Sequence, residues 1–263
     1  MRFFRDIKKY WRYIIYAGQS ELKAEVANSY LNWLWWIIEP LCFMLIYAFV
    51  FGTLFGSQIE HIQIFVYIGI TMWDFFSRVM TSSVTIVRHN KSIVSKVYIP
   101  KYMLIFVKMY VNAFKLVIAF ILLFIMVIAT GVAFTWYMLW IIPILLIMFL
   151  LSFALGTFLL HFGVYVDDLA NVVKIVLRML FYLTGIFYDL EGRLQNVMSA
   201  HMASVIGKIN PMAFLINCTR NVVMHGTAPD YKYLLIWMVI GLVLAIGGVR
   251  LVYKNENSYV KVI

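Results

Sequence analysis

Residues 104–129 read LIFVKMYVNAFKLVIAFILLFIMVIA and contain two lysines, one asparagine and no acid. The stretch from Leu116 to Ala129 is entirely apolar. About 20 predominantly apolar residues are enough for a helix to cross the hydrocarbon core of a bilayer. The composition of the whole chain agrees with this stretch, because 64% of the 263 residues are hydrophobic and only 13% are charged. The sequence therefore predicts an integral membrane protein.

Five further apolar stretches lie on either side of this one, and we expect all six to be membrane-spanning helices. Their ranges are 33–55, 63–87, 104–129, 137–163, 171–188 and 232–251. The expected fold is an all-α integral membrane domain over residues 33–251. The first 32 residues carry charges throughout and contain no apolar region followed by a cleavage site of small residues, so we expect no signal peptide.

The basic residues predict the orientation of the chain. Six Lys and Arg residues fall in 1–32, five in 88–108, two in 164–178 and three in 250–263, whereas the connections 56–62 and 130–136 contain none. The positive-inside rule therefore places both termini and the 88–101 loop in the cytoplasm, with residues 252–263 as a cytoplasmic tail. We expect a multi-pass protein of the cytoplasmic membrane. This placement accounts for the net charge of +10 without a nucleic-acid partner.

Two parts outside the spans have a recognisable pattern. In residues 1–32 apolar side chains repeat at helical spacing while the cations stay outside their arc, which predicts an amphipathic helix on the inner leaflet. The apolar set is Phe3, Phe4, Ile7, Trp11, Ile14 and Ile15. The external connection, about 189–231, contains the apolar stretches 197–206 and 211–224, which are too short to span, so we expect short re-entrant helices there.

The loop over about 88–101, RHNKSIVSKVYIPK, holds four Lys or Arg residues and no acid. One interpretation is a topology signal alone. The other is a short amphipathic helix closed by Pro100 and presented to a cytoplasmic partner, because apolar and polar residues separate on two helical faces. The apolar face would hold Ile93, Val94, Val97 and Tyr98, and the polar face Lys91, Ser92, Ser95 and Lys96.

Charged residues inside the predicted spans are few: Asp74 and Arg78 on the second helix and Lys115 on the third. Asp74 and Arg78 are four residues apart, so they form either an intrahelical ion pair or a contact to substrate. Lys115 either extends its amine to the membrane surface or faces a water-filled interior. Aromatic residues make up 17% of the chain, and those on the second and fifth helices have flat apolar faces that suit the C–H face of a sugar. Core or lipid-facing packing is the alternative.

Motifs for nucleotide, zinc or nucleophilic chemistry are absent from the sequence. The five histidines and two cysteines have no metal-ligand spacing. We therefore expect no catalytic residue, metal site or cofactor in this chain.

The order of several short motifs resembles a known family, the transmembrane (permease) subunits of type-2 ABC exporters, most closely those that move O-antigen, capsule or teichoic acid. Residues 29–40, SYLNWLWWIIEP, are similar to the head of that family's first span through Ser29, Leu31, Trp35 and Pro40. Residues 90–100, NKSIVSKVYIP, are similar to its coupling helix. The run 184–188 and the pair Asn210-Pro211 also resemble the family, whose chain re-enters the outer leaflet between them.

The resemblance implies a homodimeric pore with two copies of a separate ATPase subunit, which would bind ATP and Mg²⁺. The substrate would be a polyprenyl-linked polysaccharide. The residues implied in coupling to the ATPase are Asn90, Lys91, Ile93, Val94, Lys96, Tyr98 and Pro100. Our candidates for the substrate path are Trp73, Phe76, Tyr182 and Tyr188.

Three other functions remain open from the sequence. A type-2 exporter of drugs or lipids would have a similar coupling segment. A membrane-embedded enzyme acting on polyprenyl phosphates would need clustered charges, for which Asp167, Asp168 and Lys174 are the available residues. A secondary transporter calls for inverted repeats and interrupted helices, and neither is visible.

Overall fold

The structure is a computed structural model that describes residues 2–27, 30–54, 56, 59–190, 192 and 199–262. The described residues form helices and connections, without a β-strand. The α-helices are α1 (Arg2–Val26), α2 (Trp35–Ala48), α3 (Ile62–His89), α4 (Lys91–Val94), α5 (Tyr102–Ala129), α6 (Ile141–Tyr165), α7 (Leu169–Leu183), α9 (Ala200–Ile209), α10 (Pro211–Met224) and α11 (Tyr231–Val262). Three shorter segments are the 3₁₀ helices η1 (Asn32–Leu34) and η3 (Trp136–Trp140) and the π-helical η2 (Phe49–Leu54). The prediction of an all-α protein is confirmed for this part of the chain.

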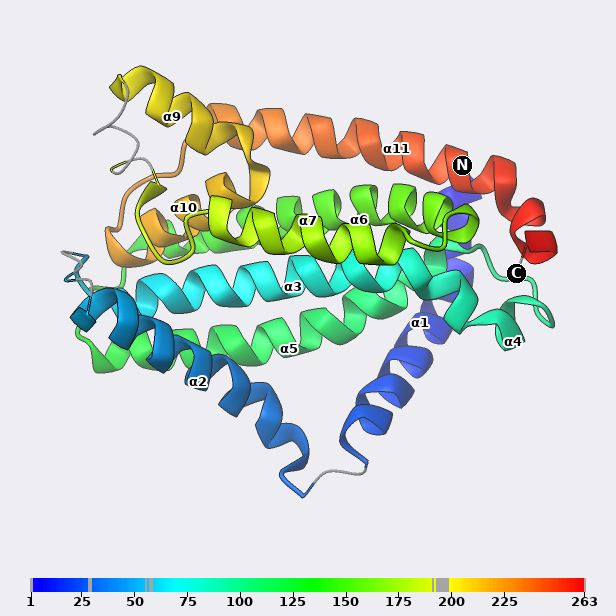
Figure 1. Cartoon of the computed structure of the whole chain (residues 1–263), viewed down its shortest axis with the longest axis horizontal. Helices are drawn as coiled ribbons and strands as arrows, with labels where there is room; N and C mark the ends of the chain where they lie inside the picture. The colour runs from blue at the N-terminus through cyan, green and yellow to red at the C-terminus, as the bar shows by residue number, and fades with distance from the viewer. Residues whose placement is uncertain are drawn as a thin grey trace.

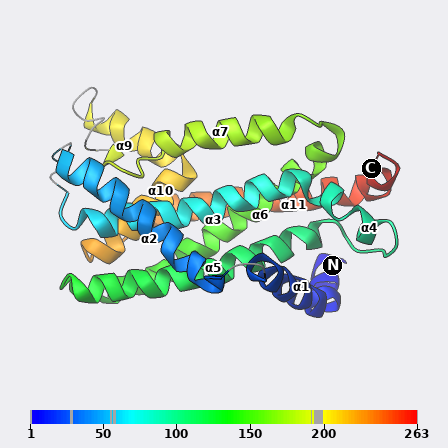
Figure 2. The same ribbon diagram turned by 60° about the horizontal axis from the view of Figure 1, so that its bottom comes forward.

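Helices α3, α5, α6, α7 and α11 run along the long axis of the molecule (Figure 1). Both termini and α4 lie at one end of this bundle, and α9 and α10 lie at the other. Helices α1 and α2 slant away from the bundle and meet in a V. Figure 2 shows the same bundle with α7 and α1 on opposite sides of α3.

Helix α3 is the centre of the fold. It packs against α2, α5, α6, α7 and α10, and most of its side chains are buried. The buried side chains surround the helix on several faces, which is the expected pattern for a helix enclosed by neighbours. Several of its polar residues, among them Asp74 and Arg78, are only half-buried.

Four helical segments of the described residues are long and apolar enough to cross a membrane: Trp35–Leu54, Tyr102–Ala129, Trp136–Tyr165 and Tyr231–Tyr259. They correspond to four of the six predicted spans. The other two predicted spans, 63–87 and 171–188, are helical as α3 and α7 but do not meet the same criterion. Helix α3 has the length but carries Asp74, Arg78 and several hydroxyl side chains, and α7 has only 15 residues.

Several predicted boundaries shift in the structure. Helix α11 continues through the predicted tail 252–263 as far as Val262. The external connection contains two helices, α9 and α10, near the two short apolar stretches; residues 197 and 198 lie outside the described part. Helix α10 begins where Asn210 Oδ1 accepts hydrogen bonds from the backbone N–H groups of Met212 and Ala213, at 3.1 and 3.3 Å, with Pro211 in the first turn.

Glycines allow two close helix contacts in the bundle. A Cβ atom at Gly163 of α6 would lie 2.0 Å from the backbone oxygen of Val84 in α3. A Cβ atom at Gly248 of α11 would lie 1.9 Å from Oγ1 of Thr157 in α6. Small residues at such points let helix backbones approach closely, which is how helices associate in membranes. These contacts fix α6 between α3 and α11.

Candidate functional site

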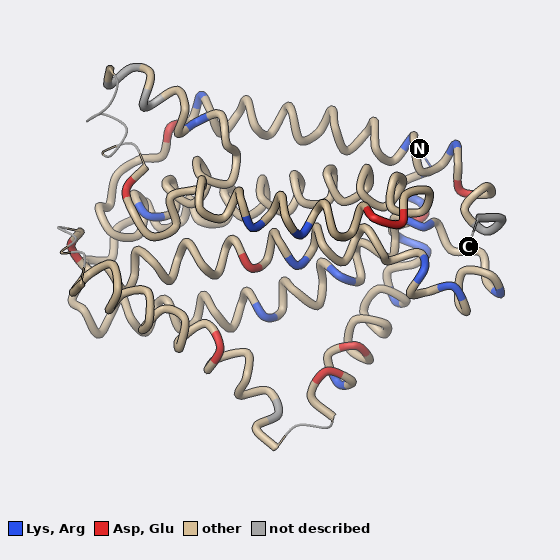
Figure 3. The backbone as a smooth tube through the Cα atoms, in the orientation of Figure 1, with Lys and Arg blue, Asp and Glu red and all other residues tan. Residues whose placement is uncertain are grey.

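The end of the bundle that carries both termini and α4 also carries the greatest density of basic positions (Figure 3). Helix α3 ends at His89, where the side-chain amide of Asn90 donates a 2.8 Å hydrogen bond to the carbonyl oxygen of Ile86. The carbonyl oxygen of Asn90 accepts hydrogen bonds from Ile93 and Val94, and these bonds form the single turn of α4. Asn90 therefore separates α3 from α4.

The predicted amphipathic helix over 88–101 is wrong in extent. Helix α4 has only four residues, and the chain from Val97 to Pro100 is not helical. A single turn cannot present a continuous apolar face to the bundle. Of the four residues predicted to form that face, Val94 is buried, whereas Ile93 is 38% and Tyr98 51% exposed. Lys91 and Lys96 are exposed as well, so this end presents a mixed basic and apolar surface.

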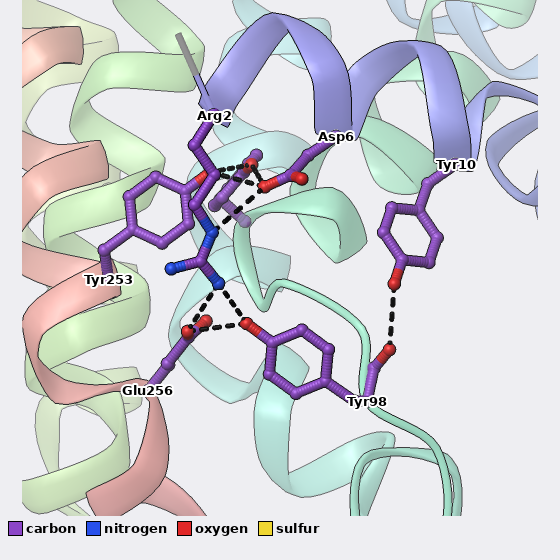
Figure 4. Close-up of polar contacts among 7 residues, drawn as sticks. Arg2, Asp6, Tyr10, Tyr98, Tyr253 and Glu256 are labelled. Carbon is purple, nitrogen blue, oxygen red and sulfur yellow. Dashed lines mark hydrogen bonds and ion pairs between the residues drawn. The ribbon is translucent and has the colours of Figure 1, made fainter.

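Tyr98 connects this loop to both ends of the chain (Figure 4). Its hydroxyl group donates a 2.6 Å hydrogen bond to Oε1 of Glu256 in α11. The guanidinium of Arg2 in α1 donates to the same carboxylate oxygen at 3.0 Å and also contacts the Tyr98 hydroxyl. Tyr10 of α1 donates a 3.1 Å hydrogen bond to the carbonyl oxygen of Tyr98.

A second group of contacts lies beside the first. Oδ2 of Asp6 accepts hydrogen bonds from the hydroxyl groups of Tyr102 in α5 and Tyr253 in α11, at 3.0 and 2.7 Å. Arg2 lies over the ring of Tyr253, 4.5 Å from its centroid. We call the full set the polar junction. It consists of Arg2, Asp6, Tyr98, Tyr102, Tyr253 and Glu256, and it joins α1, α5 and α11 to the α4–α5 connection.

The polar junction is buried at Asp6, Tyr102 and Glu256, whereas Arg2 and Tyr98 are exposed. Glu256 is 6% exposed, and its second oxygen, Oε2, is buried and has no hydrogen-bond partner among the described residues. Burial, followed by the hydrogen bond and negative charge of Glu256, raises the pKa of Tyr98 to about 12. Burial lowers the pKa of Lys101, whose amine lies 5.5 Å from the centroid of the Tyr98 ring, while the charge of Glu256 opposes this shift. Tyr98 therefore remains a hydrogen-bond donor at neutral pH.

The connection between α6 and α7 meets α3 at the same end. Arg88 of α3 forms an ion pair with Asp167 and donates a 3.0 Å hydrogen bond to the carbonyl oxygen of Val164. Asp167 was a candidate for an enzyme site only because of its neighbour Asp168. In the structure its carboxylate holds the end of α3 to the α6–α7 connection.

The charges predicted inside the spans form ion pairs. Nε of Arg78 lies 2.7 Å from Oδ2 of Asp74, and Nη2 of Arg78 lies 3.4 Å from Oε1 of Glu39 in α2. Nζ of Lys115 lies 2.6 Å from Oε2 of Glu25 in α1. Arg78 and Lys115 also line the hollows described next.

Two hollows lie on the polar side of α3. The larger, of about 580 Å³, is lined by Glu21, Glu25, Ser77, Arg78, Thr81, Ser82, Thr85, His89, Lys108, Val111, Asn112, Lys115, Ala170 and Lys174. The smaller, of about 100 Å³, lies between α2, α3 and α5 and shares Arg78, Asn112 and Lys115 with it. Lys108 pairs with Glu21 in the larger hollow. A row of hydroxyl groups on α3 thus lines a polar groove in a largely apolar bundle.

The predicted path residues do not line these hollows. Trp73 and Phe76 are buried, with ring centroids 5.7 Å apart, and Trp73 lies 6.0 Å from Phe181 of α7. Tyr182 is exposed, and the Tyr188 hydroxyl group donates to its carbonyl oxygen at 2.7 Å. In α3, Trp73 therefore faces α7, whereas Ser77, Thr81, Ser82 and Thr85 line the larger hollow. The spacing of Ser77, Thr81 and Thr85, one helical turn apart, is the signal that the sequence interpretation missed.

At the opposite end of the bundle, Arg220 is another residue that the sequence analysis did not single out. Arg220 of α10 is buried and donates to the carbonyl oxygens of Phe65, Gly185 and Ile186 at 3.1, 2.9 and 2.8 Å. Gly185 and Ile186 follow the C-terminus of α7, where helical carbonyl groups lack partners. Arg220 therefore connects α10 to both α3 and the end of α7. No local pattern in the sequence marks it, because all three partners are distant backbone atoms.

These features define a multi-pass helical membrane protein whose termini and basic α3–α5 connection meet at one end. The chain belongs to the ABC-2 type transporter family, whose model matches residues 14–224. Members of this family are transport subunits.

Three relatives are similar along nearly the whole chain. The O-antigen export system permease protein RfbA of Myxococcus xanthus is 24% identical over 244 residues, which cover 93% of this chain and 92% of the relative. Two proteins of the same name from Klebsiella pneumoniae are 24% and 25% identical over 253 residues, covering 95% of this chain and 94% of each relative.

Proposed function

We propose that this chain is the pore-forming subunit of an ATP-driven exporter that moves a polyprenyl-linked cell-surface polysaccharide across the cytoplasmic membrane. The observation that carries this proposal is the near full-length similarity to three proteins that each bear the name O-antigen export system permease. A drug or lipid exporter of the same family has no such support here. The polymer belongs to the class that includes O-antigen, capsule and teichoic acid.

The proposed assembly contains a second copy of this chain and two copies of a separate ATPase subunit, which binds the ATP and Mg²⁺. The surface around α4 is the proposed docking site for the ATPase. Ile93, Lys91 and Lys96 are exposed there, while Val94 and Pro100 are buried beneath them. The polar junction then carries a displacement of this surface to α1 and α11, because Tyr98 is bonded to both helices.

The proposed topology has six spans, with α3 and α7 added to the four segments that are apolar enough by themselves. Helix α3 has 28 residues, a length of about 42 Å at 1.5 Å per residue, which exceeds the hydrocarbon thickness of about 30 Å. Its charged side chains are tolerable in a span because Arg78 pairs with both Asp74 and Glu39. An even number of spans agrees with both termini lying at one end of the bundle, which we assign to the cytoplasm, with α9 and α10 re-entering from outside.

The proposed path for the glycan is the polar groove beside α3. Hydroxyl, amide and charged side chains line it, and these are the groups that hydrogen-bond to sugar hydroxyls. A second copy facing this groove would close it into a pore. In this proposal the groove, and not the aromatic pair Trp73 and Phe76, lines the path. Arg78 and Lys115, two of the predicted intramembrane charges, are part of its lining.

Depletion of the chain in its native host tests the function. We expect the lipid-linked glycan to accumulate on the cytoplasmic face of the membrane and surface glycan to fall, with recovery when the chain is supplied again. A host whose partner ATPase carries an inactivated Walker A lysine provides the matched control and should show the same accumulation. Normal surface glycan after depletion would contradict the proposal, as would accumulation of a drug or free lipid in place of the glycan.

A further inference from the structure

A third hollow lies on the side of α5 that faces away from the polar groove. It has a volume of about 800 Å³ and lies between α5 and the segment formed by η3 and the first half of α6. At 3.6 residues per turn, its α5 residues, such as Val117 and Phe124, fall on nearly the opposite side of the helix from Lys108 and Lys115. We call this hollow the apolar groove.

The lining of the apolar groove suits a hydrocarbon chain. Among the described residues that form it, none is charged, and Thr135 carries the single hydroxyl group. Both of its walls belong to segments that are long and apolar enough to cross a membrane. Val117, Ile121 and Ile142 line the groove and are more than half exposed. The groove is therefore continuous with the surface that these two spans turn to the bilayer.

The apolar groove has the length of one leaflet. Toward the end of the bundle that holds the termini, α5 and α6 are in contact, with the rings of Phe106 and Phe153 stacked at a centroid distance of 4.5 Å. Beyond this contact the groove follows α5 from Ala113 to Phe124. At 1.5 Å per residue this distance is about 17 Å, close to half of the hydrocarbon thickness of about 30 Å.

Polar groups lie at one end of the groove. Thr135 and Trp136 line it where η3 begins, and Trp136 is 87% exposed. Tryptophan is typical of the level of the lipid head groups. The other end of the groove is formed by the apolar side chains of Ala113 and Phe149. A chain in the groove therefore has its head group beside η3, at the end of the bundle away from the termini.

We infer that an acyl chain of an outer-leaflet phospholipid occupies the apolar groove and completes the packing between α5 and α6. A polyprenyl chain is the less suitable occupant, because it is longer than one leaflet and the groove offers no charged residue to bind its phosphate. Occupancy of the groove does not depend on which substrate is exported, whereas the assignment to the outer leaflet rests on the topology proposed above.

The floor of the apolar groove is also a wall of the smaller polar hollow. Leu116 lines both of them. Phe149 of the groove meets Phe75 of the smaller hollow edge to face, with ring centroids 4.6 Å apart. A lipid chain packed against Leu116 and Phe149 thus supports this wall from the bilayer side, where an unfilled space would leave these side chains without contacts.

The first test uses the full chain, with any partner that co-purifies, from membranes that contain phosphatidylethanolamine with a diazirine in one acyl chain. Irradiation follows solubilisation and removal of bulk lipid, so only retained lipid labels the protein. Mass spectrometry of peptides should show several-fold more label at Phe120 and Phe149 than at Ile125, which is exposed on α5 outside the groove. Label spread evenly over these three positions would overturn the inference.

Unlabelled polyprenyl phosphate, added in excess before solubilisation, separates the two sources of hydrocarbon. We expect the label at Phe120 and Phe149 to stay unchanged. Its loss would show that the groove holds the polyprenyl chain, and the inference would be wrong.

The second test compares two substitutions one helical turn apart on α5 by native mass spectrometry of retained phospholipid. Ile121 and Ile125 are 55% and 56% exposed, but only Ile121 lines the groove. Ile121→Trp fills the groove and should lower retention several-fold, whereas Ile125→Trp should retain phospholipid as the wild type does. Val117→Trp, at another exposed lining position, repeats the test if Ile121→Trp does not fold. Equal retention by the folded lining variant and Ile125→Trp would overturn the inference.

Discussion

The hydroxyl group of Tyr98 lies 2.6 Å from Oε1 of Glu256, although the two residues are 158 positions apart. Tyr98 belongs to the connection that we propose to meet the ATPase, and Glu256 belongs to the last turns of α11. Arg2 bonds to the same carboxylate oxygen. Tyr98, in the α4–α5 connection, is thus bonded to both the first and the last helix. A displacement of this connection would therefore move α1 and α11 as well.

Breaking this contact should uncouple ATP hydrolysis from export. Tyr98→Phe removes the hydrogen-bond donor and keeps the ring, so it should lower the free energy of unfolding by about 1 kcal/mol. Glu256→Gln should lower it by about 2 kcal/mol, because Arg2 also loses its carboxylate partner. Both variants should assemble with the ATPase and hydrolyse ATP but export less glycan per ATP. Because the residues share one interaction, thermal unfolding of the double variant should show less than the sum of the single losses. Tyr16→Phe, at an exposed tyrosine of α1, is the control; full additivity would show that the contact carries no energy.

The neighbours Ile93 and Val94 should separate docking from stability. Ile93→Ser changes an exposed side chain, so we expect little change in melting temperature but weaker co-purification of the ATPase. Val94→Ala shortens a buried side chain and should destabilise the chain by about 1 kcal/mol, with the ATPase retained. Quantitative mass spectrometry of the purified complex measures docking. A stable Ile93→Ser chain that binds the ATPase normally would remove Ile93 from the docking surface.

Alkaline pH should weaken the polar junction. The pKa of Tyr98 is raised from 10.0 to about 12 in the folded chain, so the folded state holds its proton more tightly than the unfolded state does. The contribution of the protonated Tyr98 to the free energy of unfolding is fully present below pH 10.0. It is lost as the pH rises through about 12. The difference in melting temperature between wild type and Tyr98→Phe should therefore shrink across this window. A difference that is constant from neutral pH to about 12 would contradict the assignment.

Adjacent glycines of α11 provide a test of the helix packing. Gly248→Ala would bring Cβ to 1.9 Å from Oγ1 of Thr157, whereas the nearest atom to a Cβ at Gly247 lies at 3.7 Å. Overpacking by Gly248→Ala should destabilise the chain by about 1–3 kcal/mol and lower its melting temperature by several degrees. Gly247→Ala should leave the melting temperature nearly unchanged. Fluorescence-detected size exclusion after heating distinguishes the two. Equal stability of both variants would argue against the close α6–α11 contact.

Filling the groove beside α3 should block export without unfolding the chain. Ser82 is half-buried and lines the larger hollow, so Ser82→Trp would place a large ring in the proposed path. Surface glycan should fall strongly while membrane insertion and ATPase binding persist. Ile128→Trp, at an exposed position of α5, adds a ring outside the groove and should export normally. Normal export by Ser82→Trp would place the path elsewhere.

The local patterns of the sequence predicted the helices of this fold. Long apolar stretches identified α5 and α6, and the charge distribution placed both ends of the chain on one side, where the structure brings them together. Helical spacing also indicated an amphipathic helix in the first 32 residues. These properties depend on residues within one or two turns of each other, so a single sequence contains them.

The contacts between distant segments were not predictable in the same way. The partners of Arg220 are backbone carbonyls far away in the chain, and the partner of Tyr98 is 158 residues distant. Which face of α3 lines a hollow was not predictable either, because aromatic residues such as Trp73 and Phe76 do not reveal from the sequence whether they meet protein or open space. The amphipathic helix over 88–101 is wrong in extent because α4 ends at Val94, and Pro100 disfavours a helical backbone at Ile99 before it.

The central claim is that this chain moves a glycan across a membrane with energy from a partner ATPase. The most direct measurement purifies the chain from its native host, reconstitutes it with its co-purifying ATPase in vesicles, and follows a radiolabelled polyprenyl-linked glycan into a protected compartment. We predict protection that requires ATP and Mg²⁺ and that is reduced per ATP hydrolysed in Glu256→Gln. Absence of any nucleotide-binding partner after gentle purification and crosslinking, or protection that is independent of ATP, would contradict the account.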